Sequence, residues 1–403
     1  MRIALLDSGL RDESGHHANF ARLIAAETAR RGWVLDVAAN KAVSPALQKA
    51  LGARPHFSAS PYDRAFADPI CGDIETFIGL NGLYRREIDA AGAVEADLVL
   101  IPTITHNQLY GLAQWLQMAA RRAKVACAVM LMFPPGWEPV ATRLGIDTAL
   151  YRFGLKQFRG LGPDRLFLHA ETGPIARTFT RLADREVAVV PWPAAEDART
   201  AASSAHAPFA GKAPTIGYFG YGKAERGIFL LPEIIASVAE ARPDARFVVQ
   251  INSFLPSETA GVADALRPFG ERAAIIEGAL ARDRLMALMA ECDVVLMPYD
   301  PEPYRERGSG LFGEAIMLGR TVVVPNGTWM AEELAANGLP GAAFDRFEAT
   351  SVAAAVFELL AGGKKLVAES EKAVAAWVGA RTARTYLDAV AASLGRGGET
   401  TES

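Results

Sequence analysis

Two glutamates eight positions apart bracket a glycine-rich segment in the second half of the chain. Glu306 precedes Gly308-Ser309-Gly310, which open a predicted helix that contains Glu314 and ends near Leu318. Glycines let a ligand approach the backbone, and the unpaired N–H groups at a helix start attract phosphate. A carboxylate can accept hydrogen bonds from sugar hydroxyls. The segment predicts a phosphate- and sugar-binding turn; the alternative is a plain turn with two solvated glutamates.

A second glycine-rich loop follows the predicted strand 215–219 and contains Gly220, Lys223 and Arg226. Lysine offers a point charge and arginine a two-pronged fork, so this loop suits a diphosphate. The Gly-Lys-Ser/Thr of a Walker A loop is absent, and the glycine spacing is not that of a Rossmann fingerprint. A solvated turn is the equally open alternative.

The loop after the first predicted strand contains Ser14-Gly15, which we expect to form an anion-accepting turn before a helix over 18–31. His16 and His17 follow it directly. Adjacent helical positions point in different directions, so we expect that the two rings do not face one point. Without acid or cysteine partners at ligand spacing, capping or surface roles are more common for such histidines than metal binding.

His106 follows the predicted strand 98–101, where a proton-transfer or hydroxyl-binding group would stand. A structural histidine with a backbone partner is the alternative. No nucleophile is evident, because Gly-x-Ser-x-Gly is missing and Cys71, Cys127 and Cys292 lie in contexts that predict burial. No Asp-x-Asp pair follows a strand, so a metal-bridged diphosphate is not expected.

The elements that must position these residues alternate between short apolar runs and helical patterns. Predicted strands cover 3–6, 34–38, 98–101, 125–132, 165–168 and 187–190, and then 215–219, 247–251, 274–276, 294–297 and 321–324. Continuous apolar runs indicate parallel strands covered on both faces, hence an α/β fold with ligands at the carboxyl ends of the strands. The small polar segment 194–213 reads as a linker, 370–394 as one long helix and 395–403 as a frayed tail.

Length, charge and cysteine content exclude several classes of protein. The 403 residues correspond to about two domains, and the net charge of 42 − 46 = −4 argues against a general nucleic-acid binder. Three scattered cysteines suit a reducing compartment. Neither a leader nor an apolar run long enough to span a bilayer is evident. We therefore expect a cytoplasmic protein, which could work at the inner face of the membrane.

The segment from Glu306 to Glu314, continued by 315–323, resembles the Glu-x7-Glu segment of retaining GT-B glycosyltransferases of the family 4-like type. Other similar segments occur in the family's order: Ser14-Gly15, 97–99 leading to His106, 217–220 with Lys223 and Arg226, 277–280 and 292–298. The resemblance spans nearly the whole chain and is strongest over 215–325.

The resemblance implies a GT-B fold of two facing Rossmann-like domains with a cleft between them. It implies an acceptor-binding domain over 1–193, the linker 194–213, a nucleotide-sugar-binding domain over 214–368, and a helix over 369–394 that could cross back to the first domain. The implied donor is a UDP- or GDP-sugar, and the acceptor a glycan, a lipid-linked molecule or a protein. Transfer would proceed with retention, without a metal or cofactor.

By the same resemblance, Glu314 would hold the ribose and Glu306 the hydroxyls of the donor sugar. The backbone of Gly308-Ser309-Gly310 would offer N–H groups, while Lys223 and Arg226 neutralise the leaving diphosphate. Two departures from the family pattern bear on these roles. The aromatic residue usual between the glycines is missing, and the two cations are only three positions apart.

Three further site residues come from the resemblance: Gly220 in the diphosphate loop, Gly15 on the first domain's side, and His106 near the transferred sugar. Acceptor contacts are less defined. Between 121 and 165, eight basic residues face three acidic ones (8 − 3 = +5), which suits an anionic acceptor, a membrane surface or simply a solvated basic face. Aromatic residues of the first half could stack on a sugar or fill the core: Trp115, Phe133, Trp137 and Tyr151.

Other functions stay open on the same pattern. A nucleotide-sugar epimerase or a phosphorylase could share the fold, although no lysine is evident to anchor the phosphorylase's pyridoxal group. A non-enzymatic two-lobed protein could close on a small ligand. Nucleotide binding would separate the enzymes from the binding protein.

Overall fold

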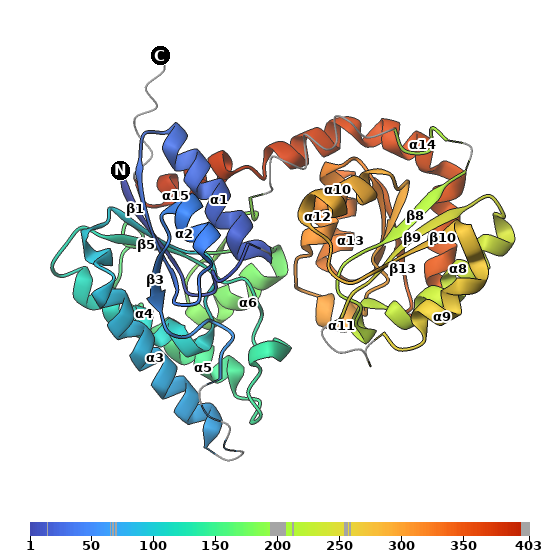
Figure 1. The fold of residues 1–403 in the computed structure, drawn as a ribbon. Helices are drawn as coiled ribbons and strands as arrows, with labels where there is room; N and C mark the ends of the chain where they lie inside the picture. Colours follow the sequence, from blue (N-terminus) through green and yellow to red (C-terminus); the bar gives the residue numbers. More distant parts are fainter. Residues whose placement is uncertain are drawn as a thin grey trace. The chain divides into compact units, whose positions relative to one another are not determined.

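The computed structural model describes residues 1–395, except residues 14, 65, 67, 69, 70, 194–206, 212, 254–256 and 258. The chain divides into two compact units, one formed by Met1–Pro193 with Ala383–Ser403, the other by Ala194–Thr382. Each unit is built on one parallel sheet with helices on its two faces (Figure 1). The predicted α/β fold is confirmed. Most of the predicted linker 194–213 and nearly all of the predicted tail lie outside the described residues.

The first unit has a seven-stranded parallel sheet in the order β3-β2-β1-β4-β5-β6-β7. Its strands are β1 Arg2–Asp7, β2 Val34–Asn40, β3 Arg54–Phe57, β4 Leu98–Ile101, β5 Ala126–Met130, β6 Leu166–Ala170 and β7 Ala188–Val189. Its helices are α1 Gly15–Arg30, α2 Pro45–Leu51, α3 Gly72–Ala90, α4 His106–Ala119, α5 Asp147–Lys156, α6 Gly173–Ala183 and α15 Ala383–Ser393, with short 3-10 turns at Ala93–Glu95 and Glu138–Val140.

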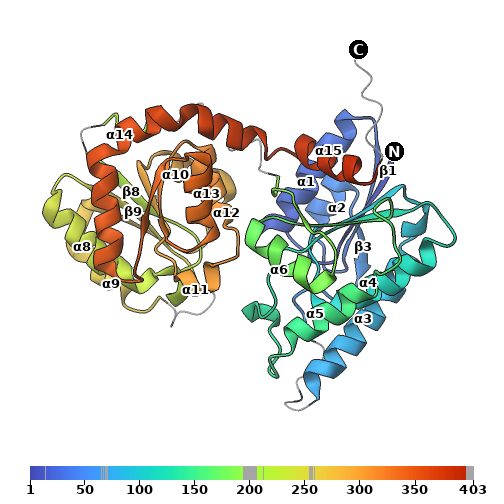
Figure 2. The same cartoon turned by 180° about the vertical axis from the view of Figure 1, so that it is seen from behind.

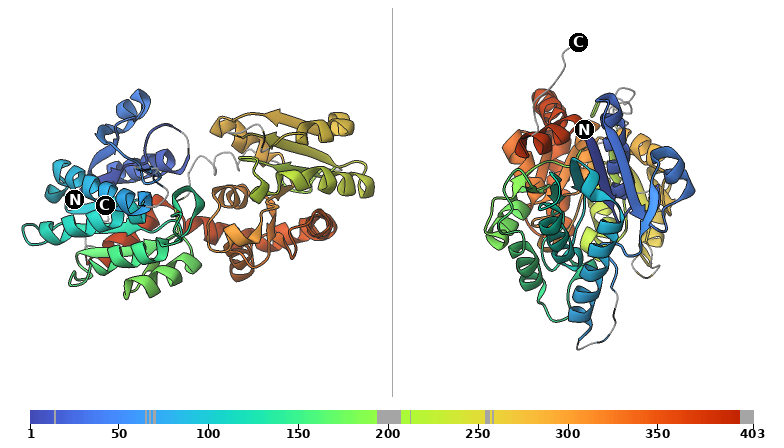
Figure 3. Two further views of the ribbon diagram at one scale, coloured as in Figure 1. Left: turned by 90° about the horizontal axis from the view of Figure 1, so that it is seen from below. Right: turned by 90° about the vertical axis from the view of Figure 1, so that its left-hand side faces the viewer.

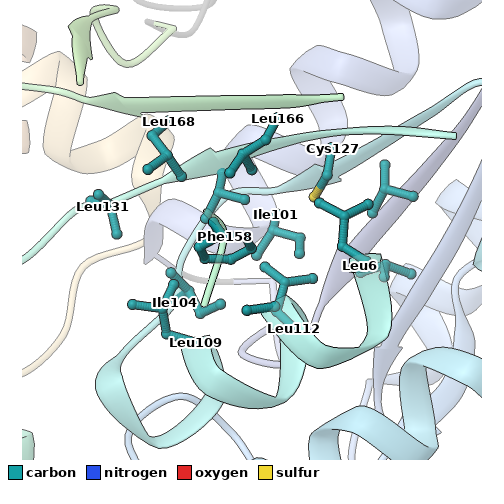
Figure 4. Close-up of a cluster of buried hydrophobic side chains, with 14 of the residues drawn as sticks. Leu6, Ile101, Ile104, Leu109, Leu112, Cys127, Leu131, Phe158, Leu166 and Leu168 are labelled. Carbon is teal, nitrogen blue, oxygen red and sulfur yellow. The ribbon is translucent and has the colours of Figure 1, made fainter. Parts of the chain in front are cut away.

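Apolar side chains fill both faces of this sheet. One layer lies under α3, α4, α5 and α6, where Leu109 and Leu112 point toward Ile101 and the neighbouring strands (Figure 4). The other layer joins the sheet to α1, α2 and α15 through Phe20 and Tyr386 among others. Burial on both faces explains the continuous apolar runs of the strands.

The second unit has a six-stranded parallel sheet in the order β10-β9-β8-β11-β12-β13. Its strands are β8 Thr215–Tyr218, β9 Arg246–Ile251, β10 Ala273–Glu277, β11 Val294–Leu296, β12 Thr321–Pro325 and β13 Gly341–Phe344. Its helices are α8 Leu231–Ala241, α9 Val262–Leu266, α10 Arg282–Ala290, α11 Pro301–Tyr304, α12 Gly310–Met317, α13 Trp329–Asn337 and α14 Ala349–Gly379, with 3-10 turns at Ala224–Arg226, Ile228–Leu230 and Arg267–Arg272. One core layer lies under α8, α9 and α14, the other under α10, α12 and α13 (Figures 2 and 3).

The single helix predicted over 370–394 is wrong. The chain instead forms α14, which begins much earlier, and the separate helix α15. The end of α14 is fixed within the second unit, where Glu333 accepts hydrogen bonds from Trp377 Nε1 and Arg381 Nη2, both at 2.7 Å. In α15, Tyr386 Oη lies 2.9 Å from His169 Nε2 of the first unit's sheet. Each helix thus has its own anchor, which accounts for the break between them.

Candidate functional site

Both sheets reverse their strand order at one point, between β1 and β4 in the first unit and between β8 and β11 in the second. In open parallel sheets, ligands bind beyond the carboxyl ends of the strands at such a point. The loops after β8 and β11 carry Gly220 through Arg226 and Glu306 through Gly310. The topology therefore places the two glycine-rich segments of the second unit next to one ligand-binding position.

The start of α12 has the geometry predicted for it. Ser309 caps the helix, and its Oγ accepts a hydrogen bond from the Phe312 N–H at 3.4 Å. The helix ends at Met317, followed by Gly319 with a φ of 68°. The first backbone N–H groups of a helix have no intrahelical partner. A Cβ added at Gly310 would meet no atom within 4 Å, so the backbone is open to an approaching group.

The structure brings Gly220, Arg226 and the start of α12 together. Gly220 has a φ of 97°, and a Cβ added there would lie 2.8 Å from Leu311 Cδ1 and 3.0 Å from Arg226 Nη1. Only glycine combines that conformation with so close an approach. A guanidinium therefore stands beside the first turn of α12, which supplies two sources of positive potential at one place.

Tyr304 orients the cations of this cluster. Its Oη accepts a hydrogen bond from Arg226 Nε at 2.9 Å, and the Arg307 guanidinium lies 4.6 Å from the centre of its ring. Lys223 precedes the short turn that ends with Arg226, and its ammonium has no ion-pair partner among the described residues. Sequence reasoning assigned no role to Tyr304 or to Arg307, although Arg307 lies inside the segment bracketed by Glu306 and Glu314.

Gln250, at the end of β9, joins two of the loops. Its Oε1 accepts a hydrogen bond from the Gly220 N–H at 2.9 Å, and its Nε2 donates to the Gly278 carbonyl at 2.9 Å. The side chain is buried. It fixes the loops after β8 and β10 relative to each other. Sequence reasoning also missed this residue; a polar side chain ending an apolar strand is the signal that could have found it.

The two glutamates differ in their surroundings. Glu314 is 16% exposed, and its Oε1 lies 2.5 Å from Nη1 of Arg282, the first residue of α10. Glu306 is half-buried in the loop between α11 and α12. Glu314 is therefore not the solvated carboxylate of the alternative reading. Sequence reasoning did not identify its partner Arg282.

The expectation that His16 and His17 do not face one point is wrong. Their Nε2 atoms lie 3.1 Å and 2.8 Å from Tyr62 Oη. Nδ1 of His17 lies 2.7 Å from a carboxylate oxygen of Asp7, at the end of β1. A carboxylate only accepts, so the Nδ1–H of His17 donates to Asp7, and Tyr62 Oη lies within hydrogen-bond distance of both Nε2 atoms. The two rings lie side by side with centres 4.1 Å apart, and Tyr62 comes from a distant loop to meet both Nε2 atoms.

Other residues close this cluster of the first unit. The Gly9 N–H donates to Asp7 at 3.0 Å, and a Cβ added at Gly9 would lie 2.3 Å from the His17 ring. Burial and the neighbouring His17 hold the pKa of His16 well below its usual value. Gly15 begins α1 with a φ of 74° and nothing within 4 Å of an added Cβ. Ser14, the other half of the predicted turn, lies outside the described residues.

His106 is the first residue of α4 and is buried. Burial lowers its pKa to about 4, against the opposing influence of Asp147 and Asp73. Among the described residues, no group accepts from or donates to its Nδ1. The ring borders a small polar pocket whose lining includes Arg64 and Arg143. His106 and Gly15 thus belong to the first unit, whereas the other predicted site residues belong to the second.

The candidate aromatic residues and two of the three cysteines contribute to packing. Trp115 and Tyr151 are buried, as the core alternative predicted, and Phe133 stacks on Trp137 with ring centres 3.6 Å apart. The prediction that every cysteine is buried is wrong for Cys71, which is exposed because it precedes the first turn of α3. Burial raises the pKa of the other two thiols. No group of three or more His, Cys, Asp or Glu able to hold a metal occurs in the described part of the chain.

Comparison with solved structures identifies the fold. A scan against protein-family models and a search of curated proteins give no match. HepE from Anabaena, solved in complex with UDP, is 16% identical, with a TM-score of 0.67 over 98% of this chain and 100% of that one. A glycosyltransferase from Rickettsia africae is 14% identical, with a TM-score of 0.66 over 98% of each chain.

A third similar structure is the UDP-forming α,α-trehalose-phosphate synthase of Burkholderia vietnamiensis, which is 12% identical. Its TM-score is 0.63, and the match covers 100% of this chain and 98% of that one. These similarities span both units of the chain. The chain therefore has the GT-B fold that the family resemblance of its sequence implies.

Proposed function

We propose that the protein is a glycosyltransferase that moves a sugar from a UDP- or GDP-sugar to a glycan, lipid-linked or protein acceptor, with retention and without a metal. The observation that carries the proposal is the meeting of Gly220, Arg226 and the start of α12 where the second sheet reverses its strand order. The fold shared with a UDP complex and with a UDP-forming synthase supports it.

In the proposed donor complex, the second unit binds the diphosphate. The N–H groups around Gly308-Ser309-Gly310 and the guanidinium of Arg226 would bind its oxygens, and Lys223 would add a second charge. Glu314 would accept hydrogen bonds from the ribose, with Arg282 fixing the orientation of its carboxylate. Glu306, on the loop before the glycines, would bind hydroxyls of the donor sugar.

The proposed chemistry follows from charge separation. Breaking the sugar–phosphate bond leaves positive charge on the sugar and negative charge on the diphosphate. A helix N-terminus and fixed cations stabilise the leaving group without moving during the reaction. The departing phosphate can take the proton of the acceptor hydroxyl, so retention needs no nucleophile from the protein. In the first, acceptor-binding unit, Gly15 would line the site and neutral His106 would bind a hydroxyl of the sugar.

Calorimetry with UDP, GDP and ADP tests the donor site. We expect one nucleotide to bind, with affinity reduced roughly 5- to 150-fold in Glu314→Gln and in Lys223→Ala, since each removes a polar contact worth about 1–3 kcal/mol. The exposed residues Glu358 and Lys364 of α14 give matched controls in Glu358→Gln and Lys364→Ala. Absence of binding by all three nucleotides would contradict the proposal.

Turnover separates the enzymes that share the fold. With donor sugar, a transferase releases nucleotide faster when an acceptor is added, whereas an epimerase changes the sugar and keeps it attached. NMR of the product reports retention, and activity after chelation reports metal independence. We expect Glu306→Gln to lower turnover more than nucleotide affinity. An unchanged rate would remove Glu306 from the sugar pocket.

A further inference from the structure

Exposed apolar side chains concentrate at one end of the first unit. In the described part of the chain, nine large apolar side chains are at least 40% exposed, and five of these surround the first two turns of α3. We call these five the α3 face: Phe66 (49% exposed), Ile74 (40%), Ile78 (65%), Leu144 (51%) and Phe153 (48%). Scattered single apolar residues are normal on a surface, but a cluster indicates a contact.

Contacts with α3 hold the five side chains together. Ile74 and Ile78 are one turn apart on its outer side. The ring of Phe66 would lie 3.1 Å from a Cβ at Gly79, and the Leu144 N–H donates to the Asp73 carboxylate at 2.9 Å.

Phe153 of α5 completes the α3 face from the other side. Its ring centre is 6.1 Å from that of Phe77 of α3 and 5.1 Å from that of Tyr110 of α4. Figure 1 shows the first turns of α3 extending beyond the sheet. The five side chains thus come from α3, its neighbour α5 and two loops that contact the first turns of α3.

The core does not require these residues. The inner side of α3 is already complete, with Phe77, Leu80, Tyr84 and Ile88 buried against α4 and the sheet. An amphipathic helix that needs only its inner side carries polar residues on its outer side. Ile74 and Ile78 depart from that pattern, and both are available to a contact from outside the unit.

Basic residues accompany the apolar ones. The segment 141–159, which carries Leu144 and Phe153, has four basic residues: Arg143, Arg152, Lys156 and Arg159. Its one acid, Asp147, is buried and accepts a hydrogen bond from Thr142 Oγ1 at 2.7 Å. On the α3 side, Asp68, Glu75 and Arg64 are all exposed, and Arg64 Nη2 donates to the Ala141 carbonyl at 2.6 Å. Of the bases in 141–159, Arg159 is paired with Asp184 at 3.1 Å, and Arg143 and Arg152 are exposed. The excess of basic over acidic side chains therefore lies on the α5 side of the face.

We propose that the α3 face docks on an anionic phospholipid bilayer. Half-exposed apolar side chains beside arginines match the boundary between acyl chains and phosphate groups, where each part finds its preferred surroundings. Docking requires no donor sugar, so it is independent of the proposed transfer.

Flotation of the full-length protein with vesicles tests the proposal. We expect binding to vesicles of phosphatidylcholine and phosphatidylglycerol at 7:3, and at least roughly tenfold weaker binding for Ile74→Gln/Ile78→Gln. The control is Val34→Gln/Met118→Gln, which changes two side chains of the same unit, 61% and 46% exposed. Its binding should stay within about twofold of wild type, and thermal unfolding should show that both variants are folded.

A second variant isolates the charge. Arg143→Gln/Arg152→Gln should weaken binding to the mixed vesicles by roughly 25-fold and reduce its salt dependence, since each basic residue adds about fivefold near an anionic surface. The proposal would be overturned if the wild-type protein did not bind these vesicles. It would also be overturned if the Ile variant and the control variant lost the same amount of vesicle binding. Self-association without lipid that disappears in the Ile variant would assign the face to a second copy instead. Nucleotide calorimetry on the same variants keeps this outcome separate from that of the transferase proposal.

Discussion

The loops at the two strand-order reversals occupy equivalent places in the two units but are filled differently. In the first unit, His17 fills the space above Gly9 and lies within hydrogen-bond distance of both Asp7 and Tyr62. In the second unit, Gly220 admits a guanidinium, and Gly310 faces open space. At Gly9 the first loop is closed by His17 and Tyr62, whereas the second loop presents positive potential and an uncovered backbone.

This difference shows that glycine and histidine at a strand end do not by themselves mark a ligand site. Whether such a loop can bind a ligand depends on which other side chains contact its polar groups. Tyr62 Oη lies within hydrogen-bond distance of both histidines of the first loop. In the second loop, Tyr304 accepts a hydrogen bond only from Nε of Arg226. The closed loop should therefore govern stability and the open loop ligand affinity.

The largest expected effect comes from glycines of similar conformation in the two units. Gly227 has a φ of 70°, and a Cβ there would lie 2.0 Å from the Pro298 carbonyl oxygen. Gly227→Ala should lower the free energy of unfolding by about 3–5 kcal/mol, because a backbone atom must move. Gly15, with a φ of 74° and open space, is the control; Gly15→Ala should lose only about 1 kcal/mol. Urea unfolding measures both, and equal losses would refute the steric argument.

The next effect depends on pH and belongs to the first unit. Burial lowers the pKa of His106 to about 4 and that of His169 to about 3. As the pH falls below about 6.5, the unfolded chain takes up these protons first, so the folded unit loses stability down to about pH 4. For His106 alone the loss is roughly 3 kcal/mol.

The second unit provides the comparison, because its described part contains no histidine. Hydrogen exchange read on peptides of each unit, corrected for intrinsic rates, should show the loss between pH 6.5 and 4 in the first unit alone. His106→Gln should flatten part of it. A parallel loss in both units would show that histidine burial is not its cause.

Sequence reasoning located the main strands because burial on both faces leaves long apolar runs. It missed β3 (Arg54–Phe57) and β13 (Gly341–Phe344), which lie at the edges of their sheets. Arg-Pro-His-Phe and Gly-Ala-Ala-Phe lack the β-branched residues of a buried strand. Pairing with a neighbouring strand, rather than local preference, makes these segments extended.

For the site, the sequence located the glycine turns and the helix start at Gly310, since both are local features. It did not predict the side chains that form hydrogen bonds with these features and fix their geometry. Gln250 is thirty positions from Gly220, and Arg282 is thirty-two from Glu314. Spacing along the chain carries no information about contacts that depend on strand order.

Removing a hydrogen-bond acceptor from the first loop should lower the free energy of unfolding by less than the two changes above. Asp7→Ala removes the acceptor of both His17 and the Gly9 N–H, so the first unit should lose about 2 kcal/mol. Nucleotide affinity should remain within about twofold, because Asp7 belongs to the other unit. Urea unfolding and calorimetry on the same preparation test this pair of expectations. Lost nucleotide binding with unchanged stability would reverse the assignment of the closed loop.

The smallest effect should come from the open loop. Tyr304→Phe keeps the ring under Arg307 and removes only the hydroxyl that accepts from Arg226 Nε. The guanidinium then loses its fixed orientation, and nucleotide affinity should fall about fivefold, the equivalent of roughly 1 kcal/mol. Tyr218→Phe is the matched control, because its hydroxyl donates to the Arg226 carbonyl at 3.3 Å rather than to the side chain. If both variants lowered nucleotide affinity equally, Tyr304 would act by packing within the loop and not by orienting the Arg226 guanidinium.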